Sequence, residues 1–107
     1  MSLKIEFHGG DEKSGDVFVV ETKAKAGYKL DQHTHDHTHL SYLVSGTALV
    51  DVGDNFIELI GPCSYVIEAN KSHTVHAVTD IVWLCLWDAK LGIKDEAIES
   101  LKLVKEY

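Results

Sequence analysis

Four histidines fall within seven consecutive positions of this 107-residue chain, and they are the residues best suited to chemistry. Residues 33 to 39 read His-Thr-His-Asp-His-Thr-His, and the whole chain has seven histidines. Neutral imidazole is a common ligand of zinc, copper, iron and nickel. On composition alone, two interpretations remain open: a built metal site, or a solvated histidine-rich segment with incidental metal affinity.

Strand geometry distinguishes among the four histidines. Residues i and i+2 of a strand share a face, so His33 and His35 lie about 6.6 Å apart and can converge on one ion. His39 would lie a further ~13 Å along a straight strand, too far to reach the same ion. The chain must therefore turn between His35 and His39, over residues 36–38, and bring His39 back on a neighbouring strand. His37 then points to solvent or to the mouth of the site, so the cluster is expected to supply three ligands rather than four.

The surrounding sequence predicts the strands that would position such a site. Runs of β-branched and aromatic residues alternate with Gly, Asn and Asp turn signals every ~8–12 residues, which is typical of a sandwich or barrel. By the alternation of sides along a strand, Ser41 and Leu43 share the face of His39, and Tyr42 faces away. His8 is expected in a loop. The predicted strands are residues 17–22, 28–35, 40–45, 48–52, 56–60, 65–68, 73–78 and 81–87.

The last 14 residues differ from the rest of the chain and predict an amphipathic helix. Residues 94–107 lack Gly and Pro and carry apolar side chains at helical spacing, with Asp95 as a plausible N-cap. We expect this helix to pack on the barrel or on a partner subunit. Small barrels often pair or cover their edge strands, so the helix predicts a homodimer.

The histidine cluster and its flanking glycines resemble the first motif of the cupin superfamily, G(x)5HxH(x)3-4E(x)6G. Gly27, His33, His35, His39 and Gly46 stand at the motif's spacings. The departure is His39, which occupies the position where cupins usually have the glutamate ligand. Four neutral imidazoles would leave the full double positive charge on the ion, unlike the usual set that includes a carboxylate.

The second cupin motif, G(x)5PxG(x)2H(x)3N, is more weakly represented. Its metal-binding histidine corresponds to His73, while Glu68, Asn70 and Ala77 replace the motif's Pro, Gly and Asn. Asparagine tolerates the left-handed backbone conformation that glycine supplies in this turn, so the turn before His73 can survive. His76 lies three residues after His73 and is expected on the other face of the strand.

The resemblance implies an all-β fold, a cupin-type double-stranded β-helix (jelly-roll) barrel, to which the sequence pattern adds a C-terminal α-helix. It places the barrel at about residues 15–88, while the length of the chain predicts a single domain over residues 1–107 and the pattern places the helix at about 94–107. It also implies one divalent transition metal, Fe, Mn, Zn, Ni or Cu. The ligands implied by the resemblance are His33, His35, His39 and His73.

Two functions are consistent with such a site. The preferred hypothesis is a metal-dependent oxygenase that acts on a small organic substrate, because the imidazoles leave open coordination positions for it or for O₂. The alternative is a metal-dependent domain that binds or senses a small ligand without turnover. No catalytic residue is assigned; the candidate acids and bases are Asp31, His37 and Tyr65.

Composition excludes several other classes. The net charge of −7, with 17 acidic and 10 basic residues, argues against nucleic-acid and anionic-membrane partners. No apolar run approaches the ~20 residues of a membrane span, and the start lacks a signal-peptide core, so a cytoplasmic location is expected. There is no Gly-rich phosphate loop. Cys63 and Cys85 are expected to be free thiols, Cys85 buried, and Trp83 and Trp87 to share a core or interface face.

Overall fold

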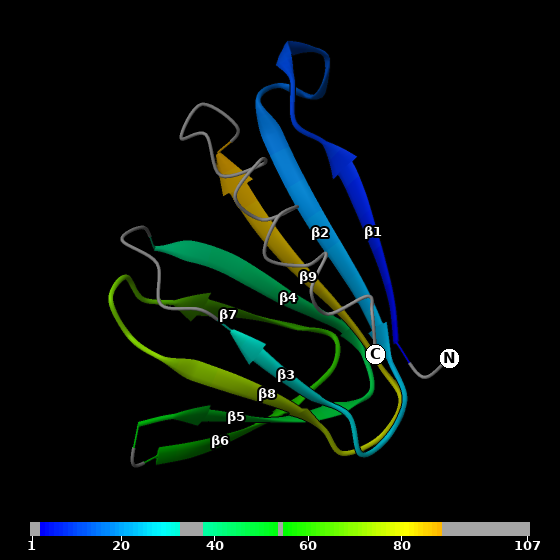
Figure 1. Ribbon diagram of the computed structural model, residues 1–107, viewed down its shortest axis with the longest axis vertical. Coiled ribbons are helices and arrows are strands. Elements are labelled where there is room, and N and C mark those ends of the chain that lie inside the picture. Colours follow the sequence, from blue (N-terminus) through cyan, green and yellow to red (C-terminus); the bar gives the residue numbers. More distant parts are fainter. Residues whose placement is uncertain (1–2, 33–37, 54, 89–107) are drawn as a thin grey trace.

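The computed structural model describes residues 3–32, 38–53 and 55–88, and it forms two antiparallel β-sheets (Figure 1). A short 3-10 turn, Glu12–Ser14, connects the first two strands. The strands are β1 (Leu3–Gly9), β2 (Val17–Ala24), β3 (Lys29–Gln32), β4 (His39–Ser45), β5 (Thr47–Val52), β6 (Asn55–Ile60), β7 (Cys63–Ile67), β8 (His73–Ala77) and β9 (Ile81–Asp88). The helix predicted over residues 94–107 lies outside the described residues.

The strand order is that of the predicted jelly roll. The five-stranded sheet has the order β1-β2-β9-β4-β7 and the four-stranded sheet has the order β3-β8-β5-β6. In Figure 1 the two sheets form opposite walls, and the chain passes repeatedly from one to the other. β9 therefore pairs with both β2 and β4, which are far from it in sequence. This crossing brings residues from distant parts of the sequence to the same interior.

The interior is filled by alternate residues of both sheets, as the period-two pattern predicts. Ser41 and Leu43 are fully buried on the face of His39, and Tyr42 is exposed on the other face, which confirms their predicted sides. Trp83, Cys85 and Trp87 are buried on one face of β9. The largest fully buried side chains are Trp83, Phe18, Leu43, Val50, Val75 and Ser41.

Two turn residues of the cupin-like motifs adopt left-handed backbone conformations. Gly46, between β4 and β5, has φ of +89°, and a Cβ there would overlap the carbonyl oxygen of Asp80. Asn70, in the turn before β8, has φ of +61°. The expectation that Asn70 supplies the conformation of the motif's glycine is therefore confirmed.

The first strand was not expected from the sequence, and the prediction of a loop around His8 is wrong. β1 covers Leu3–Gly9 and pairs with β2 along its whole length, with Glu6 opposite Glu21 and His8 opposite Val19. Ile5 is buried, while Lys4 and His8 are exposed. The alternation of apolar and polar side chains from Leu3 to His8 was the available signal.

The two cysteines differ in their surroundings. Both are free; Cys85 is buried and Cys63 is half-buried. Burial raises the pKa of the Cys85 thiol to about 11, although the neighbouring Trp83 and Ser41 side chains act in the opposite direction. Because the thiolate is the reactive form, Cys85 is expected to be inert at neutral pH.

We therefore predict that iodoacetamide at about pH 8 modifies one thiol per folded chain and two per unfolded chain. Mass spectrometry of the labelled peptides should place the first label on Cys63. The Cys63→Ser variant should take up no label until it is unfolded. Rapid labelling of Cys85 in the folded Cys63→Ser variant would show that this thiol is not sealed in the core.

Candidate metal centre

His39 projects into the interior from the five-stranded sheet. It begins β4, opposite Ile67 of β7, and it is 5% exposed. Its ring packs on that of Trp87 from β9, with centroids 3.8 Å apart and planes 33° from parallel. The indole therefore fixes one side of this imidazole and makes an apolar wall beside it.

His73 projects into the same interior from the four-stranded sheet. It begins β8, between Gln32 of β3 and Val52 of β5, and it is 3% exposed. The centroids of the His39 and His73 rings are 6.4 Å apart. Since metal–nitrogen bonds to imidazole are about 2.0–2.1 Å long, this separation is compatible with one ion between the rings. Two of the four predicted ligands thus meet across the barrel.

Backbone carbonyl groups contact the Nδ1 atoms of both rings. The Nδ1 atom of His39 lies 3.4 Å from the carbonyl oxygen of Leu40, and that of His73 lies 3.5 Å from the carbonyl oxygen of Lys71. A carbonyl can only accept, so each contact favours the tautomer with the proton on Nδ1 and the lone pair on Nε2. Both Nε2 atoms are buried. This arrangement is the one that metal-binding histidines commonly show, and the donors fit a divalent transition metal.

The other two predicted ligands lie outside the described residues, as does His37. β3 ends at Gln32, directly opposite His73, so the chain reaches the neighbourhood of His73 immediately before position 33 in the sequence. Asp31 lies on β3 opposite Thr74. The set of His33, His35, His39 and His73 remains a prediction.

His76, by contrast, faces away from the interior, as predicted. It lies on β8 three residues after His73, is half-buried, and its ring is 6.5 Å from that of Phe56 on β6. The Nε2 atom is buried without a hydrogen-bond partner among the described residues. One strand thus carries a histidine on each face.

A small cavity of about 70 Å³ opens beside His73. It shares three lining residues, Val52, Tyr65 and Lys71, with a wider surface pocket of about 480 Å³. The inner cavity is lined by Val52, Tyr65, Val66, Ile67, Glu68, Lys71 and His73. The outer pocket is lined by Val52, Gly53, Asn55, Ile57, Tyr65, Lys71 and Ser72. Tyr65 is thus one candidate acid that lies beside a predicted ligand.

Lys71 and Glu68 form an ion pair at this opening. The Lys71 Nζ and Glu68 Oε2 atoms are 2.9 Å apart, and both side chains are more than half exposed. The hydrogen bond and charge of Glu68 raise the pKa of Lys71, so the ammonium stays charged. The sequence analysis named Glu68 only as the replacement of the motif's proline and did not predict its pairing with Lys71, because the pair follows from the local turn before His73.

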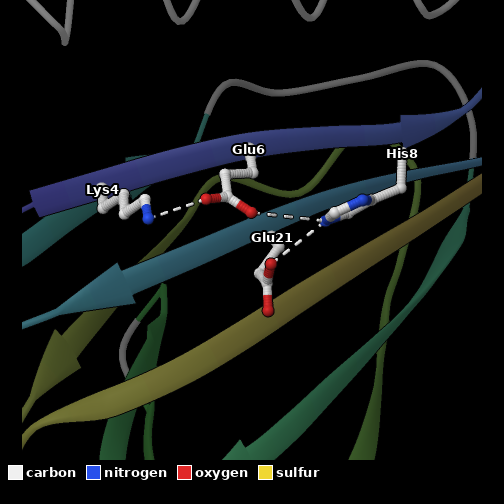
Figure 2. A network of polar contacts seen from close by, with 4 residues as sticks. All are labelled: Lys4, Glu6, His8 and Glu21. Atoms are coloured by element: carbon white, nitrogen blue, oxygen red, sulfur yellow. Dashed lines mark hydrogen bonds and ion pairs between the residues drawn. The ribbon is translucent and has the colours of Figure 1, made fainter.

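A second group of potential ligands lies on the outer face of β1 and β2 (Figure 2). The Nε2 atom of His8 is 3.0 Å from Oε1 of Glu21 and 3.9 Å from Oε2 of Glu6. Lys4 lies 2.9 Å from the other oxygen of Glu6, and the pKa of that carboxyl is lowered by its hydrogen bond with Lys4. These contacts form a surface network of polar side chains, separate from the predicted histidine site.

Comparisons with known proteins rest on structure alone. No family model and no curated protein matches the sequence. Separately, within the described residues no helix has the length and apolarity of a membrane span. A cupin superfamily protein from Desulfitobacterium hafniense has a TM-score of 0.69 and 14% identity, over 78% of this chain and 74% of its own.

Two further solved structures have similar TM-scores. KdgF from Halomonas sp. has a TM-score of 0.67 and 18% identity, over 79% of this chain and 78% of its own. Ectoine synthase from P. lautus has a TM-score of 0.70 and 15% identity, over 89% of this chain and 72% of its own. The two-sheet topology and these neighbours together show that the chain has the cupin fold.

Proposed function

We propose that this chain is a small metal-dependent oxygenase, with one divalent transition metal held by His33, His35, His39 and His73. The observation that carries the proposal is the pair of His39 and His73. These two buried imidazoles come from different sheets, and their ring centroids are 6.4 Å apart. Two imidazoles that approach each other from opposite sheets are a suitable pair of ligands for one divalent transition-metal ion.

The chain's own residues would prepare the site in three ways. The carbonyl groups of Leu40 and Lys71 favour the tautomer that aims each Nε2 inward. The Trp87 indole packs against one side of the His39 ring and limits the access of water to it. Tyr65 lines the cavity beside His73, where its hydroxyl can donate or accept a proton. The bound ion would supply Lewis-acid or redox activation of a small substrate.

The alternative is a domain that binds or senses a small ligand without turnover. For either function the inner cavity limits the size of the ligand, because its volume of about 70 Å³ is well below the roughly 300–1,000 Å³ of pockets that enclose drug-sized ligands. A site of this size suits a ligand of a few atoms, or one end of a larger molecule. Similar structures include ectoine synthase, an enzyme, but fold likeness does not decide between the alternatives.

Elemental analysis of protein purified without affinity resin tests the metal directly. The expected result is about one transition-metal ion per chain. Oxygen-electrode assays with a panel of diketones, phenols and thiols then separate the two functions. Substrate-dependent oxygen consumption supports the oxygenase, while saturable binding without consumption supports the alternative. Protein without metal, which also fails to take up zinc, iron or manganese, would overturn both.

A further prediction concerns the all-histidine character of the site. Protons compete with the ion for imidazoles, which ordinarily titrate near pH 6.5, whereas a glutamate is protonated only near pH 4.3. Metal affinity should therefore fall steeply between about pH 7 and pH 5. The His39→Glu variant should keep its metal to lower pH and shift its preference toward Mn²⁺.

Calorimetric titration of both proteins with Zn²⁺ and Mn²⁺ across that range measures the effect. The wild type and the variant share the remaining histidines, so the difference between their pH profiles reports on position 39 alone. Unchanged affinity of the wild type at about pH 5 would show that the ligand set is not four imidazoles.

A further inference from the structure

The opening beside His73 has an uneven distribution of charge. The inner cavity is lined by apolar and polar side chains in similar measure, and its charged residues among those described are Glu68 and Lys71. Lys71 also lines the outer pocket, where no acidic residue accompanies it among the described lining residues. In a chain with a net charge of −7, Lys71 is the one lysine or arginine among the described residues that line these two hollows, and it lines the cavity that His73 also lines.

We infer that Lys71 and Tyr65 form a subsite for a carboxylate group of the substrate, beside the histidine site. Both residues line the inner cavity and the outer pocket, so both lie where the two hollows adjoin, and the inner one is also lined by His73. An ammonium group and a phenolic hydroxyl are complementary to a carboxylate, since both can donate hydrogen bonds to it. This inference rests on the proposed function and narrows its substrates to small organic anions.

Glu68 is the competitor that such a substrate would displace. Its carboxylate already accepts a bond from Lys71 at 2.9 Å, with side chains that are 63% and 58% exposed. Exposed ion pairs of this kind contribute little to stability, so exchange of one carboxylate for another costs little. The pair therefore holds Lys71 at the opening until an anionic ligand arrives.

Succinate and its monoamide, succinamate, provide a matched pair of probes for the full-length protein loaded with zinc. One carboxylate of succinate can approach the histidine site while the second reaches Lys71; succinamate has an uncharged amide in place of one carboxylate. Calorimetry should show that the wild type prefers succinate by about fivefold, the ratio expected at the upper end for an exposed ion pair. Lys71→Met should abolish this preference, Lys71→Arg should retain it, and Tyr65→Phe should weaken it.

Substitution of Glu68 should act in the opposite direction. Glu68→Gln frees Lys71 from its competitor and should increase the affinity for succinate above that of the wild type. Lys25→Met is the matched control, because Lys25 is also an exposed lysine paired with a carboxylate, that of Asp80, at 3.2 Å. This control should bind both probes as the wild type does. Metal content should be the same in all of these proteins.

Repeating the titrations with zinc-free protein separates the two proposals. If the wild type binds no metal but still prefers succinate, and the Lys71→Met variant does not, the subsite is supported and the metal proposal is overturned. A protein that holds zinc, but whose wild type and Lys71→Met variant discriminate equally between the probes, overturns the subsite alone. Equal effects of Lys25→Met and Lys71→Met would also overturn it, because they would reflect net charge.

Discussion

Replacing His73 by alanine is expected to empty the metal site, whereas replacing His76 by alanine is expected to leave it filled. The two histidines lie three residues apart on β8, so they share the same strand but face opposite sides. His73 is buried against His39, and His76 lies near Phe56 on the outer face. Loss of groups that merely orient a ligand typically costs 10–100-fold in affinity, so loss of the ligand itself should cost about 100-fold or more.

Zinc titration followed by calorimetry measures this difference, with circular dichroism to establish that both variants are folded. His37→Ala provides a second comparison, since the predicted turn points His37 away from the ion. If His76→Ala or His37→Ala lowers zinc affinity as much as His73→Ala does, the assignment of ligands is wrong. If His73→Ala keeps wild-type affinity, His73 is not a ligand at all.

Substituting alanine for Gly46 is expected to destabilise the fold by roughly 2–5 kcal/mol, the sum of a left-handed backbone penalty and a steric overlap. Gly46 has φ of +89°, and its added Cβ would overlap the carbonyl oxygen of Asp80. The same methyl group would lie 2.8 Å from Oγ1 of Thr79 and 3.0 Å from Cγ2 of Ile81. Since two of these atoms belong to the β8–β9 turn and the third begins β9, that turn must move to admit it.

Gly53 is the matched control for backbone conformation without crowding. It has φ of +64° and no atom within 4 Å of its added Cβ. Gly53→Ala should therefore cost about 1–2 kcal/mol, the backbone term alone. Urea unfolding of the two variants separates the terms, and equal destabilisation would show that contact with the β8–β9 turn does not matter.

Much of the fold follows from local pattern. The alternation of side chains correctly assigns Ser41 and Leu43 to the interior, and it separates His73 from His76. The left-handed conformation of Asn70 also follows from residue type. These features depend on a few neighbouring residues, whose preferences act directly on the backbone.

Other features depend on which strands become neighbours, and local pattern does not determine that. The contact between His39 and Trp87 requires β4 to pair with β9, across more than 40 intervening residues. The network of His8 and Glu21 requires the register of β1 against β2. The tautomers of His39 and His73 depend on backbone carbonyls, which carry no signature in the sequence.

β1 was also not predicted, although the sequence contains the alternating pattern of a strand. Leu3, Ile5 and Phe7 alternate with polar residues, but the segment is short and ends at two glycines. An alternating run of this length is equally compatible with an irregular segment. Pairing along all seven residues with β2 resolves the ambiguity in favour of a strand.

His39 and His73 begin strands in different sheets, so one ion bound to both would act as a tether between the two walls of the barrel. Unfolding would have to break that tether, and the folded state would gain about 2.7 kcal/mol when free metal is 100 times its dissociation constant. Preparations of identical sequence would then melt at different temperatures according to their metal content. Resistance to heat would thus follow the supply of metal in the surrounding solution.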